Sequence, residues 1–350
     1  MSKLQKHNFY SQIVDLLQSA QKQVVRTVNQ TMVTTYFEIG KMIVEEEQKG
    51  YQRAEYGKAI IKDLSKVLTQ EFGRGFSKRN LEQMRQFYQV YSKAQTVSAQ
   101  FQDIDNKQDK PLFELSWSHY LTLIRIDNGD ERKFYEIESS KNNWSVRELK
   151  RQYDTALYTR LTLSRDKEKI KELSVLGQFI QNAKDSIKDP YILEFLGLPE
   201  NSSYSESELE QRIIDKLEHF LLELGNGFTF VARQKRISFD DKNFYIDLVF
   251  YNRLLKSFVL IDLKIGELKH QDIGQMQMYV NFYDRKIKLE EENKTIGIIL
   301  CQNKSDSVVE FTLPENNEHI FASKYETVLP SKDDLMQLME DPAPYGKING

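Results

Sequence analysis

The sequence has 350 residues, of which 40% are apolar and 29% are charged, and its formal net charge is -3. This length predicts two domains, and the composition is typical of globular proteins, which excludes a largely disordered chain. The small net charge excludes a global basic field, so only local basic patches can support nucleic-acid binding. The apolar runs are far shorter than the roughly 20 residues of a membrane helix, and the N-terminus lacks a signal-peptide core. We therefore expect a cytoplasmic protein that makes no membrane contact.

Apolar residues recur at helical spacing from Phe9 to about Tyr91, which predicts a helical first half. The segment Gly73–Ser77 breaks this pattern, and Ser77 is a suitable N-cap for the next helix. The polar stretch from Ala94 to Lys110 predicts a loop. His119 is expected to pack rather than to bind a metal. The aromatic residues of this half are expected to form a core rather than to stack on bases: Phe87, Tyr88, Trp117, Tyr120, Phe134 and Tyr135.

A capping box, formed by Ser145 and Glu148 three residues later, opens another helix, which we expect to continue through Tyr158. The charged segment Arg165–Lys171 that follows is typical of a surface helix or a linker. We place the domain boundary close to this segment. The sequence thus predicts a helical N-terminal domain over residues 1–165, with a role in DNA binding or in assembly.

The hydrophobic period changes in the second half. A helix is predicted from about Ser207 to Leu224, and the glycines directly after it are a strong stop signal. The single cysteine, Cys301, is expected to be a small buried hydrophobe rather than a nucleophile. Three strands, a helix, a buried strand and a final helix beginning at Ser331 follow: 228–237, 244–251, 258–265, 272–283, 295–301 and 331 onwards. This order predicts an α/β domain over residues 166–350.

Two of these strands carry charged residues that need an explanation. Asp247 lies in a strand that is otherwise apolar on both faces, and a buried unpaired carboxylate costs several kcal/mol. In the next strand Asp262 and Lys264 are separated by one leucine, so they share a face. A hairpin that turns symmetrically about Leu254 and Leu255 would place the two aspartates opposite each other.

Opposed Cβ atoms in an antiparallel pair lie about 4.5–5.5 Å apart, so the carboxylates of Asp247 and Asp262 must repel unless a cation lies between them. A hard divalent ion such as Mg²⁺ suits this position, because it takes one or two carboxylates and keeps sites for water and phosphate. Such a site suits the hydrolysis of a phosphodiester, in which Lys264 would orient the attacking water or neutralise charge on the substrate phosphate. The alternative is an ion pair of Lys264 on a half-exposed sheet face.

Four further segments carry a likeness to known proteins: Phe76–Leu81 (FSKRNL), Trp144–Leu149 (WSVREL), Phe220–Gly225 (FLLELG) and Gly274–Met276 (GQM). The aspartates and the sequence Asp262-Leu263-Lys264, which follow an acidic helix, resemble the PD-(D/E)xK nuclease superfamily. More closely, the chain from about Gln21 to Met336 resembles the bacterial YhcG family (DUF1016). The sequence departs from the superfamily pattern at Ile246, where proline is common, and at Asp262, where glutamate is frequent.

The resemblance implies a fold of class α + α/β, with a helical N-terminal domain before a restriction-endonuclease-like (αβββαβ) domain around a mixed central sheet. It implies that Mg²⁺ or Mn²⁺ is bound by Asp247, Asp262 and a helix carboxylate, which is Glu210 or, as the competing choice, Glu208. Gln275, on the helix after the Lys264 strand, would join Lys264 in the catalytic set. The alternative for Gln275 is an amide on the helix surface.

Two basic clusters in the helical half are candidates for DNA contact. The first, Arg74, Lys78 and Arg79, lies at the start of a capped helix, where basic residues can approach phosphates. The second consists of Arg147, Lys150 and Arg151. The alternative for both is an ordinary solvated face.

These patterns predict a metal-dependent DNA endonuclease in restriction, defence or DNA processing. The alternative is a non-catalytic DNA-binding or assembly subunit that retains the nuclease fold, and an RNA substrate is a weaker third possibility. Beyond DNA, the partners that we expect are further copies of the chain or the subunits of a defence system.

Overall fold

A computed structural model of the chain describes residues 3–49, 54–98, 113–163, 167–178, 180, 182–198, 204–240 and 242–329. Two compact units make up the chain, Met1–Lys150 and Arg151–Gly350. None of the helices in the described ranges has both the length and the apolar character needed to cross a membrane. The helix expected from Ser331 lies outside the described residues.

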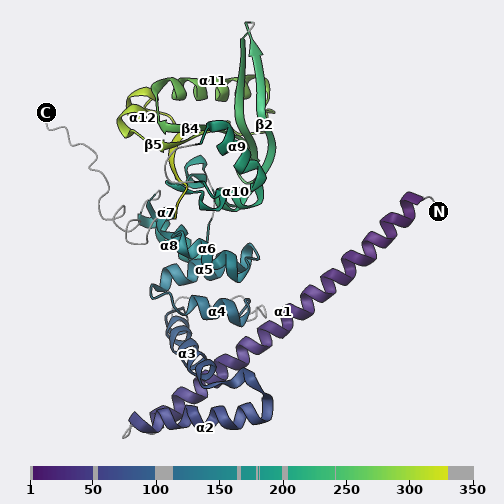
Figure 1. Cartoon of the computed structure of the whole chain (residues 1–350), viewed down its shortest axis with the longest axis vertical. Coiled ribbons are helices and arrows are strands. Elements are labelled where there is room, and N and C mark those ends of the chain that lie inside the picture. The colour runs from purple at the N-terminus through teal and green to yellow at the C-terminus, as the bar shows by residue number, and fades with distance from the viewer. Residues whose placement is uncertain are drawn as a thin grey trace, which may run out of the picture. The chain divides into compact units, whose positions relative to one another are not determined.

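The N-terminal unit is helical, as its apolar spacing predicts (Figure 1). The ring centroids of Phe87, Phe113 and Tyr120 lie 5.0 to 5.4 Å apart, and the three residues are almost fully buried, so this half has an aromatic core. The expected loop does not begin at Ala94, because the helix before it extends to Ser98, and the rest of the expected loop lies outside the described residues. The helices are α1 Lys3–Lys49, α2 Ala54–Phe72, α3 Lys78–Ser98, α4 Trp117–Leu123, α5 Gly129–Lys141 and α6 Val146–Asp154, with a 3-10 turn at Arg74–Phe76.

The helix that begins after Ser145 is shorter than predicted. It ends at Asp154, and Ala156 adopts a left-handed backbone conformation with φ 47° before α7 begins. Because non-glycine residues rarely adopt this conformation, the break is set by tertiary contacts rather than by local preference. Two helices follow the break: α7 Leu157–Leu163 and α8 Lys167–Leu176.

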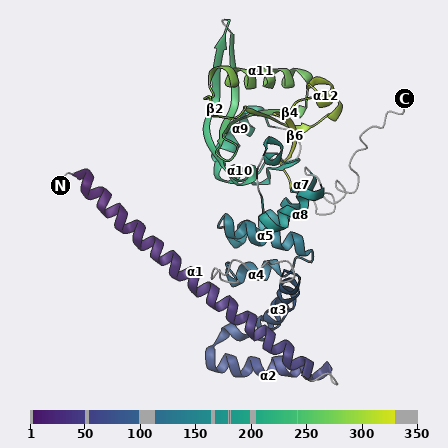
Figure 2. The ribbon, with the colours of Figure 1, turned by 180° about the vertical axis from the view of Figure 1, so that it is seen from behind.

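A six-stranded mixed sheet forms the centre of the C-terminal unit, with strand order β1-β6-β5-β4-β3-β2 (Figures 1 and 2). Strands β2, β3 and β4 are antiparallel, whereas β4, β5, β6 and β1 are parallel, which confirms the predicted mixed sheet. The strands β1 and β6 and the helix α12 were not predicted. The strands are β1 Tyr191–Ile192, β2 Phe228–Phe239, β3 Lys242–Asn252, β4 Ser257–Glu267, β5 Ile296–Asn303 and β6 Ile320–Glu326.

Helices cover both faces of this sheet, which explains why its inner strands are apolar at nearly every position. On one face Leu209 and Phe220 of the paired helices α9 and α10 pack against strand residues such as Ile261. On the other face Met276 of α11 packs closely on Gly297, where any side chain would collide with it. Cys301 is fully buried here, as expected. The helices are α9 Glu206–Asp215, α10 Leu217–Leu224, α11 His270–Lys286 and α12 Asp306–Thr312.

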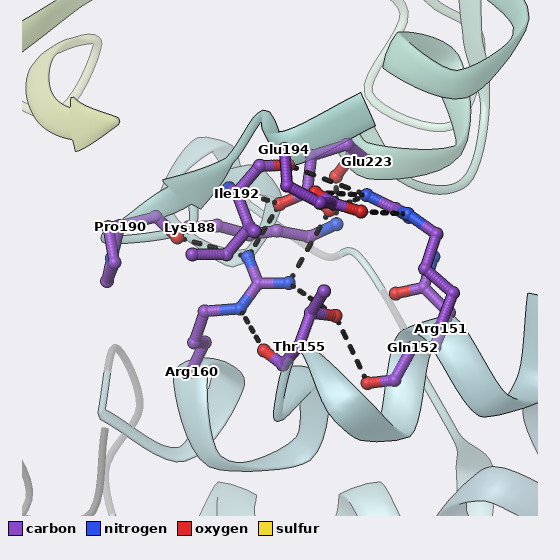
Figure 3. A network of polar contacts seen from close by, with 9 residues as sticks. All are labelled: Arg151, Gln152, Thr155, Arg160, Lys188, Pro190, Ile192, Glu194 and Glu223. Atoms are coloured by element: carbon purple, nitrogen blue, oxygen red, sulfur yellow. Dashed lines mark hydrogen bonds and ion pairs between the residues drawn. The ribbon is translucent and has the colours of Figure 1, made fainter. Parts of the chain in front are cut away.

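A buried network of charges joins α7 to the rest of the C-terminal unit (Figure 3). The Arg160 and Glu223 side chains have no exposed surface, and Arg160 Nη1 lies 2.6 Å from Glu223 Oε1. Arg160 also donates to the carbonyl oxygens of Thr155 and Pro190, and the Ile192 amide donates to Glu223. Burial alone would raise the pKa of Glu223, but the surrounding cations, Arg160 first, lower that pKa to about 2.

Replacing Glu223 with Gln should destabilise the C-terminal unit by about 3–5 kcal/mol at pH 7, because the cations would remain buried without their counter-charge. The folded pKa lies below the unfolded one, so the ion pair contributes fully above about pH 4.5 and is lost as the pH falls toward 2. Urea unfolding of the two proteins should therefore converge at low pH. Glu218→Gln, an exposed site on the same helix, is the control. A loss below about 1 kcal/mol for Glu223→Gln at pH 7 would contradict the assignment.

Candidate functional site

The two aspartates lie next to each other where the strands β3 and β4 separate. The ladder between these strands runs from Asn252 opposite Ser257 to Leu248 opposite Ile261, which is the predicted register. Asp247 and Asp262 are the next residues beyond the last ladder pair. There the Leu263 amide donates to Asp247 Oδ2 at 2.8 Å, so a side chain takes over the role of the backbone acceptor.

Asp262 is 2% exposed, and its carboxylate oxygen Oδ2 lies 2.9 Å from Lys264 Nζ. Burial first, and then the charge of Asp247, raise the pKa of Asp262 to about 7 against the opposing effect of Lys264. Burial would lower the pKa of Lys264, but the charge of Asp262 outweighs it and raises that pKa. Lys264 alone therefore does not fully neutralise the two carboxylates at neutral pH.

Glu210, on α9, is 3% exposed and is connected to Asp247 through Gln234. The Gln234 side-chain nitrogen donates to Glu210 Oε2 at 2.6 Å and to Asp247 Oδ1 at 2.9 Å. Arg233 Nε donates to the other oxygen of Glu210 at 3.0 Å. Glu208, the competing helix carboxylate, is exposed and caps the helix at Ser205. Of the two candidates, the structure brings only Glu210 to the aspartates.

The sequence analysis missed Gln234. Its backbone has φ 44°, a left-handed conformation inside β2 that side chains rarely adopt. Strain of this kind is concentrated at functional sites, where the surrounding contacts hold it in place. Before the bulge between Phe230 and Ala232, the register of β2 would place Arg233 opposite Asp247; the bulge shifts that register by one residue and places Gln234 there instead. The sequence therefore holds no clear signal for this contact.

Gln275 lies on α11, as expected, and reaches the site through Tyr279. Its amide donates to the Tyr279 hydroxyl, which donates to the Tyr245 carbonyl oxygen at 2.8 Å. Burial first, and then the nearby charges of Asp262 and Asp247, raise the pKa of Tyr279. The sequence analysis did not single out Tyr279, although it lies one helical turn after Gln275 and thus on the same face.

A further acidic side chain, Glu206, also lies at the site and was missed. Its carboxylate is 3.7 Å from Lys264 Nζ and accepts a hydrogen bond of 3.3 Å from the Ile265 amide. Its place in the first turn of a helix is an ordinary one for an acidic residue, so its sequence position indicates nothing more. Lys264 therefore lies between two carboxylates, which hold its charged end in place.

The donor chemistry of the aspartate pair fits a hard divalent cation. Asp262 Oδ2 is buried and makes no hydrogen bond of good geometry with any described residue, its contact with Lys264 being an ion pair. Mg²⁺ takes one or two protein carboxylates and leaves its other positions to water and phosphate. In the described ranges, however, no three acidic, histidine or cysteine side chains are grouped as metal ligands. The expected third ligand, Glu210, is instead held by Arg233 and Gln234.

Five of the six basic residues predicted to contact DNA are exposed on the N-terminal unit: Arg74, Lys78, Arg79, Arg147 and Lys150. Lys78 lies 3.7 Å from Glu82, a surface pair of little energetic weight. The prediction for the sixth, Arg151, needs correction. Its side chain is 14% exposed, lies 2.7 Å from Glu194 and is also paired with Glu223, so it belongs to the buried charge network.

Comparison with known proteins gives matches over most of the chain. Residues 184–340 match the family model described as YhcG PDDEXK nuclease domain, and residues 12–160 match the DUF1016 N-terminal domain. A protein of Escherichia coli (strain K12), "Putative nuclease YhcG", is 39% identical over 341 residues, which cover 92% of this chain and 90% of that protein.

Solved structures with a partial likeness are also known. A repair endonuclease from Pyrococcus abyssi is 19% identical with a TM-score of 0.26, over 37% of this chain and 50% of that one. An EndoMS–dsDNA complex is 18% identical with a TM-score of 0.27, over 38% of this chain and 49% of that one.

The raised pKa of Asp262 predicts a pH-dependent effect on stability. The folded pKa of about 7 exceeds the ordinary 3.8, so ionising Asp262 destabilises the fold increasingly as the pH rises from about 4 to above 7. Asp262→Asn removes this cost, so the variant should be more stable than the wild type at pH 8 by at least about 1 kcal/mol. The difference should vanish near pH 4.

Urea unfolding at both pH values measures this difference, with the exposed Asp127→Asn as the control. A variant that is less stable than the wild type at pH 8 would show that the Lys264 ion pair outweighs the burial of Asp262.

Proposed function

The chain belongs to the YhcG family, whose C-terminal domain is a PD-(D/E)xK nuclease domain, and from this premise we propose that it is a metal-dependent DNA endonuclease. Nucleases of this superfamily generally use divalent metal ions. The observation that carries the proposal is the buried Asp262 beside Asp247, with Lys264 Nζ 2.9 Å from the Asp262 carboxylate. The ion that we propose is Mg²⁺ or Mn²⁺.

Asp247 and Asp262 would hold the ion, which supplies charge stabilisation and an activated water at the phosphate. Gln234 fixes the Asp247 carboxylate from one side, and the Leu263 amide fixes it from the other. A carboxylate held by two hydrogen bonds loses little further freedom when it binds a cation. Lys264, held by Asp262 and Glu206, would orient the attacking water or stabilise negative charge on the phosphate.

Exposed basic residues in both units support DNA as the substrate. Arg74, Lys78 and Arg79 form one group on the N-terminal unit. In the C-terminal unit Lys235 and Arg236 follow Gln234 along the edge strand β2 and are exposed, so cations lie within a few residues of the proposed catalytic centre. Phosphate contacts of this kind position DNA without reading its sequence. The setting that we propose is restriction, defence or DNA processing.

Asp262→Asn should abolish cleavage in the presence of Mg²⁺ or Mn²⁺ while the protein remains folded. Lys264→Ala should lower kcat by about 100-fold or more with little change in KM, because its role is confined to the reacting phosphate. The assay uses purified full-length protein on single-stranded, duplex, branched and methylated DNA, and on RNA. Asp127→Asn is the matched control and should cleave like the wild type.

Full cleavage by Asp262→Asn, with contaminating nuclease excluded, would rule out the mechanism. If the wild type binds DNA but cleaves none of the substrates with either ion, the chain is a DNA-binding subunit that retains the nuclease fold. Cleavage of RNA alone would show that the substrate is RNA rather than DNA.

Neutralising Arg74, Lys78 and Arg79 together should weaken binding to all duplex sequences alike. Each lost phosphate contact reduces the magnitude of the negative slope of log K against log salt by about 0.9, so the loss of three contacts should reduce it by about 2.7. Arg285, Lys286 and Lys294, exposed residues at or beyond the C-terminal end of α11, supply the matched control with the same change in charge. A triple variant with the wild-type slope would show that this helix is not the DNA-contacting surface.

A further inference from the structure

The N-terminal half of α1 presents a long apolar row to solvent among the described residues. In Figures 1 and 2 this half runs clear of α2 and α3. Between 38% and 68% of each of these side chains is exposed, whereas soluble monomers rarely expose contiguous apolar patches of this size. The residues are Tyr10, Ile13, Val14, Leu16, Leu17, Val24, Val25, Val28 and Met32.

The C-terminal half of the same helix behaves differently. Val33, Phe37 and Ile43 are buried, and Gly40 lies so close to the Met84 backbone of α3 that a side chain would collide with it. At 3.6 residues per turn, Val33, Phe37 and Gly40 lie on a different side of the helix from the exposed row. The helix therefore has one apolar face that packs within its own unit and a second one that the described residues leave uncovered.

The spacing of the exposed row is that of a coiled coil. Its central positions alternate between steps of four and three residues: Tyr10, Val14, Leu17, Gln21, Val24 and Val28. This is the alternation of a and d positions in a heptad, with Val14, Gln21 and Val28 at a and Leu17 and Val24 at d. β-branched residues at a favour two parallel strands when leucine stands at d; Val14 and Val28 meet the first condition, and Leu17 meets the second at one of the two d positions. The row extends over about 27 Å of helix.

Gln21 indicates which partner covers this row. An amide at a buried a position must find a hydrogen-bonding partner, which neither a lipid surface nor a purely apolar groove supplies. In a parallel pair of identical helices in register, Gln21 meets the Gln21 of the other copy, and a polar a residue of this kind fixes register and strand number.

The charges of the helix also suit self-pairing. The residues that flank the seam are uncharged, so two copies bring no like charges together: Ser11, Ile13, Gln18, Ala20, Val25 and Thr27. Helices that lie on membranes carry many Lys and Arg residues on the polar face. Between Tyr10 and Val28 this helix has only Asp15, Lys22 and Arg26 as charged residues.

We propose that two copies of the chain associate through a parallel two-stranded coiled coil formed by residues 10–28 of α1, with Gln21 facing Gln21. Leu17 and Val24 are the central d-position contacts of this interface. The proposal does not depend on the nuclease activity.

The mass of the full-length protein in solution tests the interface, by light scattering after size-exclusion chromatography. The wild type should have twice the mass of one chain, and Leu17→Glu with Val24→Glu should have the mass of one. Ser19→Glu with Gln23→Glu adds the same charges on the opposite face and should remain dimeric. Circular dichroism shows that each variant is folded. A monomeric wild type, or a dimeric folded Leu17→Glu/Val24→Glu variant, would overturn the proposal.

A cysteine at position 21 tests the parallel register. The natural Cys301 is buried, so the wild-type chain should not cross-link through it under mild oxidation. Gln21→Cys should form a disulfide-linked dimer on a non-reducing gel, because a parallel, in-register seam places this residue next to its own copy. Gln23→Cys, on the outer face, should remain uncross-linked. A dimer in which Gln21→Cys does not cross-link while Gln23→Cys does would contradict the arrangement.

Discussion

The rest of the site depends on the repulsion between two carboxylates. They are held beside each other where the ladder between β3 and β4 ends. Asp262 is 2% exposed, and Asp247 is fixed by hydrogen bonds from Gln234 and Leu263. The burial of Asp262, and then its repulsion by Asp247, keep the pKa of Asp262 near 7 despite Lys264. Such a pair would gain stability if a cation of higher charge entered, which is the physical basis of the proposed metal site.

The stability of the C-terminal unit depends on a second buried charge cluster, in which the protein's own side chains supply both the negative and the positive charges. Arg160 and Glu223 neutralise each other with no exposed surface, and backbone carbonyl oxygens complete the bonding of Arg160. This cluster differs from the aspartate pair in how far its cations balance the charge of the buried carboxylate. In the structural cluster the cations hold the pKa of Glu223 near 2, whereas at the aspartate pair one lysine leaves the pKa of Asp262 raised. A perturbed pKa with an incomplete set of partners makes this position a candidate for function.

The sequence predicted the parts of this site that depend on local periodicity. The alternation of side chains placed Asp262 and Lys264 on one face, and hairpin symmetry aligned β3 with β4. The sequence did not predict the contacts that form between segments far apart in the chain. Gln234 reaches Asp247 only because a bulge and a left-handed residue distort β2, and Arg151 is paired with Glu194, far along the chain. β1 has two residues, and β6 mixes polar with apolar residues, so neither has the pattern of an independent strand.

Calorimetric titration of Mn²⁺ into the metal-free, full-length protein tests the central claim most directly. With the pKa of Asp262 near 7, binding at pH 6 should release close to one proton per ion, and binding at pH 8 should release almost none. Repeating the titration in buffers of different ionisation enthalpy measures this proton release. Asp247→Asn should lose the binding. Unchanged binding by Asp247→Asn, or proton release that is the same at both pH values, would contradict a metal site formed by these two aspartates.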